Sequence, residues 1–341
     1  MERSATSTDV ARRAGVSQST VSLVLRGKDE GRVTPQTAER VRKAARELDY
    51  EPNAVALNLK RGRADVVALV VPTVTQPYFA SVLVEAEKEA RQEGCDVILF
   101  DSGGDHDWTG RLTRMVRSRQ LDGAIVWAPT EDEVRALEGI SASLVLVEAG
   151  SAAFSRIDLQ IEQGAELVGE HLRGLGHERF GYFGVQAPRD TYLRRQRALR
   201  AYVEAHGGRV VEACSVESPL ELDAAQEAAD RLIAAALADG SVTAIVCDDD
   251  LLAASLVTMC GERGVPVPGR LSIVGYGDLS VARLVRPQLT TVRLPTDVGG
   301  LAMKRLIRAV HGTGGSRGRR SEDALSVPVA LVERASSGPP P

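Results

Sequence analysis

The residues best suited to recognise another molecule lie in a short polar stretch near the N-terminus. From Gln18 to Leu25, apolar residues recur at helical spacing and leave Gln18, Ser19 and Ser22 on the opposite face. Amide and hydroxyl groups on one face of a helix can exchange hydrogen bonds with base edges in the major groove of DNA. The stretch therefore predicts a helix that binds DNA.

A preceding helix and a tight turn are needed to present such a surface. We expect this helix to begin at about Thr8 or Asp9, where a polar N-cap comes before an apolar face. Gly15 then gives the backbone the freedom to turn, Val16 fills the angle between the helices, and Ser17 caps the second helix. The two segments together are typical of a helix-turn-helix.

A third helix completes the expected small domain. Thr34 and Pro35 form a capped helix start, and apolar residues continue at helical spacing to about Tyr50. Residues 1–50 are therefore predicted to be an all-α helix-turn-helix domain that binds DNA. Residues 51–64 are predicted to form a hinge helix and linker.

The net charge of −4 is unevenly distributed along the 341 residues. Of the 42 basic and 46 acidic residues, residues 1–63 hold 13 and 8, which gives this part a charge of +5. The remainder holds 29 and 38, a charge of −9. The basic excess coincides with the helix-turn-helix, as expected for contacts with DNA phosphates.

Cysteine usage and hydropathy exclude several protein classes. The four cysteines are widely spaced, so they predict neither a metal site nor a disulfide framework, and we expect no cofactor. No stretch approaches the roughly 20 apolar residues of a membrane span, and the N-terminus lacks the apolar core of an export signal. We expect a cytoplasmic protein that has no membrane partner.

From residue 65 the pattern changes to buried strands that alternate with helices. Continuous apolar runs separated by helices predict two doubly wound parallel-sheet subdomains with a ligand cleft between them, over residues 65–335. Residues 312–320 are expected to be a mobile loop before a last strand over 327–331, and the tail, residues 336–341, is expected to be disordered. The expected strands are Val66–Val71, Val97–Phe100, Ala124–Trp127 and Leu144–Val147 in one subdomain, and Arg179–Phe183, Arg209–Glu212, Ala244–Cys247 and Leu271–Gly275 in the other.

Several motifs, in this order, resemble those of the lactose/galactose repressor family of bacterial transcription regulators. The resemblance extends from Thr6 to about Arg334 and implies a dimer on a pseudopalindromic DNA operator. It also implies a periplasmic-binding-protein-like core that senses a small-molecule effector. The motifs are Asp9-Val10-Ala11, Ala14-Gly15-Val16-Ser17, Thr20-Val21-Ser22, Pro52-Asn53-Ala54-Val55-Ala56, Leu175-Gly176-His177, Ile273-Val274-Gly275-Tyr276 and Pro287-Gln288-Leu289-Thr290-Thr291-Val292.

The resemblance assigns DNA contacts to particular residues. Gln18, Ser19 and Leu23 match positions that meet base edges, although Leu23 departs from the polar residue often found there. Leu59 matches a leucine that relatives insert into the minor groove, with Lys60 beside it. The full set of expected DNA contacts is Thr8, Ser17, Gln18, Ser19, Thr20, Ser22, Leu23, Asn53, Ala56, Leu59 and Lys60.

An effector site is implied in the cleft. For the aromatic pair Tyr78-Phe79, the competing interpretation is packing in the core or at a dimer interface. For Arg195, the competing interpretation is a surface ion pair. The pair Gln160-Ile161 replaces a polar pair of sugar-sensing members, which disfavours a simple sugar as effector. The expected effector contacts are Tyr78, Phe79, Arg189, Thr191, Arg195, Asp249 and Asp278.

Two other groups of residues raise the possibility of different chemistry. The run Asp248-Asp249-Asp250 is either a Mg²⁺ or phosphoryl-transfer site or, as we favour, a strand-to-helix turn with a capping aspartate. His177 is interpreted as a structural residue of a turn, because no nucleophile motif accompanies it. The sequence therefore predicts a regulator, and the alternative is a small-molecule-binding protein or an enzyme on the same core.

Overall fold

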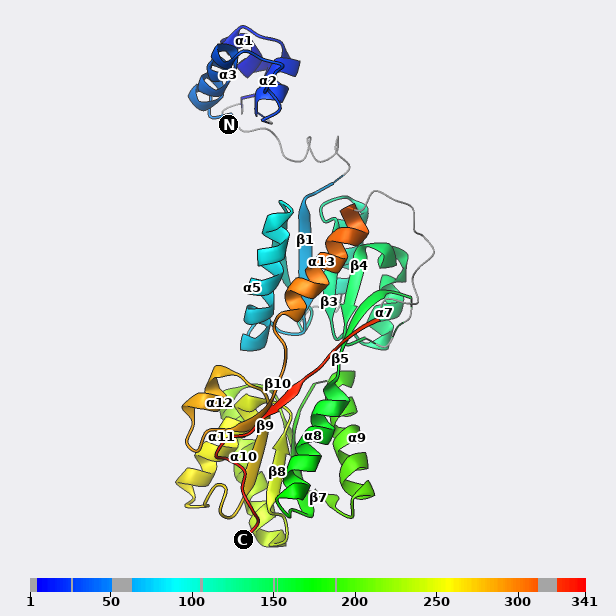
Figure 1. Cartoon of the computed structure of the whole chain (residues 1–341), viewed down its shortest axis with the longest axis vertical. Helices are drawn as coiled ribbons and strands as arrows, with labels where there is room; N and C mark the ends of the chain where they lie inside the picture. The colour runs from blue at the N-terminus through cyan, green and yellow to red at the C-terminus, as the bar shows by residue number, and fades with distance from the viewer. Residues whose placement is uncertain are drawn as a thin grey trace. The chain divides into compact units, whose positions relative to one another are not determined.

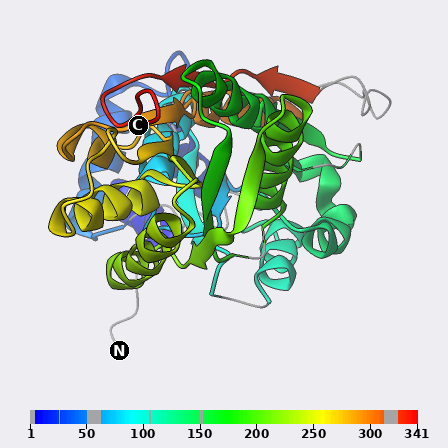
Figure 2. The ribbon, with the colours of Figure 1, turned by 90° about the horizontal axis from the view of Figure 1, so that it is seen from below.

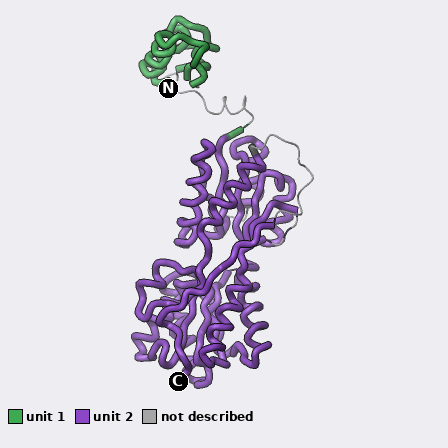
Figure 3. The backbone as a smooth tube through the Cα atoms, in the orientation of Figure 1, with its two compact units in different colours: residues 1–64 green, residues 65–341 purple. Residues whose placement is uncertain are grey.

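The computed structural model describes residues 5–25, 27–50, 63–104, 107–149, 151, 153–187, 189–311 and 324–341. It divides into two compact units, Met1–Ala64 and Asp65–Pro341, here called unit 1 and unit 2 (Figure 3). Residues 51–62 of the expected hinge helix and linker (51–64) and the expected loop at residues 312–320 lie outside the described residues.

Unit 1 is a bundle of three short helices, α1 (Ser7–Ala14), α2 (Gln18–Leu25) and α3 (Pro35–Glu47) (Figure 1). Helix α1 begins before the expected Thr8 or Asp9, because Thr6 is the N-cap and forms a reciprocal capping box with Asp9. Gly15 ends α1 in the left-handed conformation, with φ 65°. The turn that the sequence predicts at this glycine is therefore present.

The core of unit 1 is made of small apolar side chains from all three helices. Thr34 caps α3 with Pro35 in the first turn, as expected, but α3 ends at Glu47 and not near Tyr50. Val16 and Leu25 pack against this core while remaining partly exposed. The buried members are Val10, Ala11, Ala14, Val21, Val24, Ala38, Val41, Ala44 and Ala45.

The first subdomain of unit 2 is a six-stranded parallel sheet in the order β11-β5-β4-β3-β1-β2. Alternate residues of its strands face opposite sides, so one face packs on α5 and α13 and the other on α6 and α7. The strands are β1 (Val66–Val71), β2 (Asp96–Asp101), β3 (Gly123–Trp127), β4 (Leu144–Val147), β5 (Ser155–Leu159) and β11 (Ala324–Val327). The helices are α5 (Pro77–Gln92), α6 (Trp108–Arg117), α7 (Glu131–Leu137), the 3₁₀ turn η1 (Glu138–Ser143) and α13 (Val298–His311).

The second subdomain has a six-stranded sheet in the order β12-β10-β9-β8-β6-β7, in which only the pairing of β12 with β10 is antiparallel. Helices α8 and α9 cover one face, and α10, α11 and α12 cover the other (Figure 2). The strands are β6 (Arg179–Val185), β7 (Arg209–Ser218), β8 (Ala244–Cys247), β9 (Ser272–Gly277), β10 (Thr290–Arg293) and β12 (Ala330–Val332). The helices are α8 (Ile161–Gly174), α9 (Asp190–Ala205), α10 (Leu222–Asp239), α11 (Asp250–Glu262) and α12 (Ser280–Leu284).

The chain passes between the two subdomains three times, from β5 to α8, from β10 to α13 and from β11 to β12 (Figure 1). The single last strand expected over 327–331 is therefore wrong. Pro328 follows β11 and lacks a backbone N–H, so the ladder of the first sheet ends there, and the next strand pairs in the second sheet.

The expected disorder of residues 336–341 is also wrong. Ser336 is fully buried, where its hydroxyl donates to Ile273 O and accepts from Thr290 N at 2.8 Å. Gly338 O lies 2.9 Å from His177 Nε2 and accepts from Ser272 Oγ at 3.0 Å. The tail is held because it supplies partners to buried polar groups, which composition alone does not reveal.

Candidate functional site

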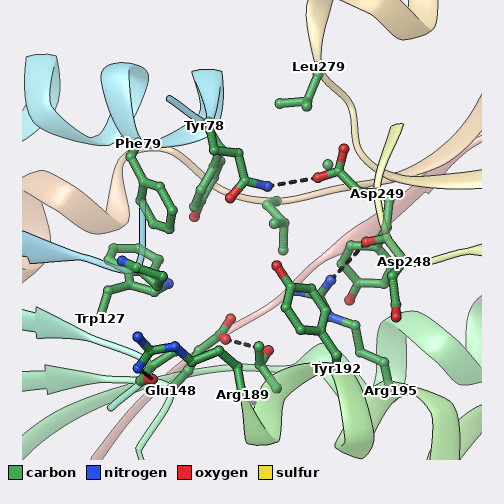
Figure 4. A pocket seen from close by; sticks show the side chains of 17 residues that line it. Tyr78, Phe79, Trp127, Glu148, Arg189, Tyr192, Arg195, Asp248, Asp249 and Leu279 are labelled. Atoms are coloured by element: carbon green, nitrogen blue, oxygen red, sulfur yellow. Dashed lines mark hydrogen bonds between the residues drawn. The ribbon is translucent and has the colours of Figure 1, made fainter. Parts of the chain in front are cut away.

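A small cavity of about 40 Å³ lies between the two subdomains of unit 2 (Figure 4). The lining comes from the carboxyl ends of strands in both sheets and from the helices that follow them, as is usual for doubly wound folds. The polar and aromatic residues of the lining are Gln76, Tyr78, Phe79, Trp127, Glu148, Arg189, Thr191, Tyr192, Arg195, Asp248, Asp249 and Tyr276.

One wall of the cavity consists of three aromatic rings. Tyr78 and Phe79, from the first turn of α5, pack edge to face against Trp127 at the end of β3, with ring centroids 5.4–5.6 Å apart. The Tyr78 hydroxyl donates to Pro295 O at 2.9 Å, and burial raises the pKa of Tyr78 well above its ordinary value. The aromatic pair thus belongs to the core and to the cavity wall at once.

Arg195 of α9 lies in the opposite wall and is 7% exposed. Its guanidinium stacks over the Tyr276 ring at 3.8 Å, and Nη1 donates to Asp248 O at 3.3 Å. Burial disfavours the charge, but Tyr276, Glu148 and Asp248 together raise the pKa of Arg195 above its ordinary value. Its Nε–H has no hydrogen-bond partner among the described residues, so the interpretation as a surface ion pair is wrong.

Two residues at the start of α9, the N-cap Arg189 and Thr191, bind the first subdomain directly. The Arg189 guanidinium donates to Glu133 Oε2 at 3.0 Å, to Ala128 O and to Ser102 Oγ. The Thr191 hydroxyl donates to Glu148 Oε2 at 2.6 Å. These hydrogen bonds join the two subdomains across the cavity.

The three consecutive aspartates are held by hydrogen-bond donors. Asp248 accepts from Tyr182 OH and Val185 N, whereas Asp250 accepts from Thr291 Oγ1 and Leu279 N. Burial, the largest effect, raises the pKa of Asp248 to about 6 and that of Asp250 to about 7.

Asp249, the middle residue of the three, is the N-cap of α11. It accepts from Leu251 N and, across the cavity, from Gln76 Nε2, each at 2.7 Å. Burial raises the pKa of Asp249 to about 6. The capping interpretation of the run accounts for this residue, and among the described residues no group of three His, Cys, Asp or Glu side chains is arranged to hold a metal ion.

Asp278 does not line the cavity, so its expected role as an effector contact is wrong. Its carboxylate forms ion pairs with Arg293 and Arg334, both through hydrogen bonds. Burial opposes the charge, but the two arginines lower the pKa of Asp278. A carboxylate that is already paired twice is unavailable to a ligand.

The other six residues expected to contact an effector do line the cavity (Figure 4). The sequence analysis missed Gln76, Trp127, Glu148, Tyr192 and Tyr276. Trp127 and Glu148 end or directly follow predicted strands, so the rule that ligands bind at the carboxyl ends of strands would have found both.

In unit 1, the residues expected to contact DNA lie on α2, with Ser17 just before it and Thr8 on α1. Thr8, Ser17, Gln18 and Ser19 are exposed, and Thr20, Ser22 and Leu23 are half-buried. Gln18 Nε2 donates to Ser7 Oγ at 2.6 Å, while Ser17 Oγ accepts from Thr20 N and so caps α2. The four expected contacts in the hinge, Asn53, Ala56, Leu59 and Lys60, lie outside the described residues.

Comparison with known proteins adds sequence evidence to this geometry. Residues 6–53 match the model of the bacterial regulatory proteins of the lacI family, and residues 169–337 match a periplasmic binding protein-like domain. The HTH-type transcriptional repressor PurR of Proteus mirabilis is 30% identical, over 97% of this chain and 96% of its own length. The chain belongs to the lacI family.

Other comparisons agree with this membership. The HTH-type transcriptional regulator DegA of Bacillus subtilis is 27% identical, over 97% of both chains. A crystal structure of the lac repressor dimer bound to operator and an anti-inducer has the same fold, with a TM-score of 0.83 and 22% identity over 98% of this chain and all of that chain. The LacI-family protein described here is thus a DNA-binding transcriptional regulator and not an enzyme.

One structural finding concerns membranes. None of the helices of this LacI-family regulator, over the residues that the structure describes, has the length and apolarity to span a bilayer.

Proposed function

We propose that this regulator binds a pseudopalindromic DNA operator as a homodimer and represses transcription in the cytoplasm, with its affinity controlled by a small-molecule effector. The observation that carries the proposal is the polar face of α2, exposed on a small unit beside a basic excess of +5 over residues 1–63. A recognition helix of this kind reads base edges while basic side chains contact phosphates.

The proposed DNA contacts extend from unit 1 into the hinge. Gln18 has an amide suited to adenine, and the half-buried Leu23 suits the methyl group of thymine. Leu59 and Lys60, with Asn53 and Ala56, are proposed to enter the minor groove, where an apolar wedge unstacks one base step.

A dimer would match the two-fold symmetry of a pseudopalindromic operator. Large apolar side chains on the surface of unit 2 support this part of the proposal. Val84 on α5 is 62% exposed and Leu284 on α12 is 74% exposed. Exposed apolar side chains of this size are the kind that a protein interface buries.

The cavity of unit 2 is the proposed effector site. It is bridged by hydrogen bonds from Arg189, Thr191 and Gln76, so a bound molecule that replaces or strengthens these bonds changes the angle between the subdomains. A coupling free energy of about 1–3 kcal/mol between effector and operator would change operator affinity roughly 5- to 150-fold.

The test uses the full-length protein and duplexes from the region upstream of its own coding sequence. We expect salt-dependent, sequence-selective binding in a fluorescence anisotropy titration, and at least about a tenfold loss of affinity for the best duplex in Gln18→Ala. The matched control is Gln92→Ala, at the exposed C-terminal end of α5, which should bind like the wild type. Equal binding to every duplex, or an unchanged affinity in Gln18→Ala, contradicts the proposal.

A further inference from the structure

We propose that the effector carries a positively charged nitrogen and that Asp249 binds it. This inference rests on the proposed effector function of the cavity between the two subdomains, and it names the chemical class of the molecule bound there.

The carboxylate of Asp249 differs from those of its two neighbours in where its partners lie. The Asp248 carboxylate accepts from Tyr182 and Val185, and the Asp250 carboxylate accepts from Thr291 and Leu279. All four donors belong to the second subdomain. Asp248 and Asp249 both line the cavity, but the Asp249 carboxylate accepts a hydrogen bond from Gln76 of the first subdomain (Figure 4). A molecule in the cavity therefore meets this carboxylate.

Negative charge in the cavity exceeds positive charge. Arg189 already forms an ion pair with Glu133, with Nη1 3.0 Å from Oε2. Arg195 is then the remaining cation of the lining, and it faces three acidic residues of the same lining, Glu148, Asp248 and Asp249. None of those three carboxylates forms an ion pair within 4.0 Å among the described residues, and each is at most 6% exposed.

A buried carboxylate without an ion pair is unfavourable even when it accepts hydrogen bonds, so a ligand that brings a cation gains an ion pair that the protein does not supply. The aromatic wall favours the same class of molecule. Tyr78, Phe79 and Trp127 line the cavity, and a cation within about 6 Å of the face of such a ring is attracted to it.

Arg195 shows that the cavity is built to receive a polar molecule. Its Nε–H is buried, lacks a hydrogen-bond partner among the described residues, and belongs to a side chain in the cavity wall. A neutral acceptor on the ligand satisfies this donor, since Glu148 and Asp248 already surround the guanidinium with negative charge. The geometry thus favours a molecule with a cationic nitrogen and a neutral acceptor.

Asp249→Asn is the variant that isolates the charge. Asparagine retains Oδ1 to accept from Leu251 N and cap α11, and its amide group can donate to the side-chain oxygen of Gln76 once that amide turns over, so one negative charge is lost while the cap is kept. The matched control is Asp223→Asn, an exposed position in the first turn of α10 that loses the same charge outside the cavity.

The probes are benzylamine, benzyl alcohol and benzoate, which share an aromatic ring and differ in charge. Binding to the full-length protein is measured by isothermal titration calorimetry up to roughly tens of millimolar, the range of weak fragment binding. We expect benzylamine to bind the wild type and Asp223→Asn at least about tenfold more tightly than benzyl alcohol, with benzoate weakest. In Asp249→Asn the preference for benzylamine over benzyl alcohol should fall to less than about threefold.

Three outcomes overturn the inference: benzyl alcohol or benzoate binding as tightly as benzylamine, an unchanged preference in Asp249→Asn, or no binding of any of the three probes. Failure of the proposed function is seen separately, as the absence of selective duplex binding in the anisotropy titration. Preferential binding of benzylamine without duplex binding would support the inference and contradict the proposed function.

Discussion

At the scale of single residues, Asp249 combines a structural and a proposed binding role at a free-energy cost. Its carboxylate caps α11, yet it is 4% exposed and has no ion pair among the described residues. Burial therefore raises its pKa to about 6, from 3.8. A group whose pKa is higher in the folded protein than in the unfolded chain destabilises the fold as the pH rises between these two values.

This cost predicts how Asp249→Asn changes the pH dependence of stability. The folded wild type binds more protons than the unfolded chain between about pH 4 and pH 6, so its stability relative to the variant falls across that range and stays low above it. We expect the free-energy difference in favour of the variant to grow by about 1 kcal/mol from about pH 5 to about pH 8. Denaturant unfolding followed by tryptophan fluorescence measures it, since both tryptophans, Trp108 and Trp127, lie in unit 2.

The comparison of variant with wild type removes the contribution of titrating groups that do not interact with Asp249. The charge of Asp249 helps to raise the pKa of Asp248 and of Asp250, so its removal lowers both and adds to the same trend. The pKa values of His171 and His177 are lowered, chiefly by burial, and both histidines are present in the two proteins, so their effect cancels. Asp223→Asn should show a difference from wild type that does not vary with pH over this range. A difference for Asp249→Asn that is flat, or that shrinks as the pH rises, would be inconsistent with a buried, unpaired carboxylate.

The residues of the cavity show how far sequence reasoning reaches. Six of the seven effector contacts that the family resemblance implied line the cavity, at strand ends and helix starts. Asp278 does not, because Arg334 lies 56 residues further along the chain and its pairing with Asp278 depends on the path of the C-terminal segment. Pairing between distant residues leaves no periodic signal.

At the scale of elements, local chemistry sets where each helix begins. The Thr6 hydroxyl accepts from Asp9 N at 3.3 Å and donates to Asp9 Oδ2 at 2.6 Å, so α1 begins at Ser7. The pair satisfies backbone N–H groups that an uncapped helix would leave without partners.

Removal of this cap should loosen α1 and leave unit 2 unchanged. Thr6→Ala should destabilise the helix by about 1 kcal/mol, whereas Thr6→Ser keeps the hydroxyl and should resemble the wild type. Hydrogen exchange of the α1 amides, followed by mass spectrometry, should be about fivefold faster in the alanine variant. Equal exchange rates in all three proteins would show that the capping box does not stabilise α1.

The strands differ in how well the sequence locates them. The strands β1, β4 and β8 have the expected ends, because each is an unbroken apolar run bounded by polar or turn residues. The sequence analysis did not predict β5, which carries Ser155, Arg156 and Asp158 among its five residues. Its pairing with β4 and β11 comes from the tertiary fold and not from its own composition.

At the scale of the whole molecule, the C-terminal segment closes the second subdomain. Removal of residues 336–341 would leave Thr290 N, Ile273 O and the His177 ring without the partners that the tail provides. Because unsatisfied buried groups cost about 1–3 kcal/mol each, we expect this truncation to destabilise unit 2 by at least about 2 kcal/mol.

Removal of residues 339–341 alone is the matched control, since Ser336 and Gly338 keep their hydrogen bonds. It should lower the stability by less than half as much. Denaturant unfolding of the two truncated proteins makes the comparison. Equal stability of the longer truncation and the wild type would mean that the tail contacts are dispensable.

The three crossings between subdomains also determine when each sheet can be completed during protein synthesis. The first sheet needs β11, residues 324–327, to cover the edge of β5, although β5 itself ends at Leu159. While the ribosome makes the residues between them, β5 has an open edge that another nascent chain can pair with. The newly made regulator is therefore most exposed to aggregation late in translation, and slow elongation between β5 and β11 would prolong that period.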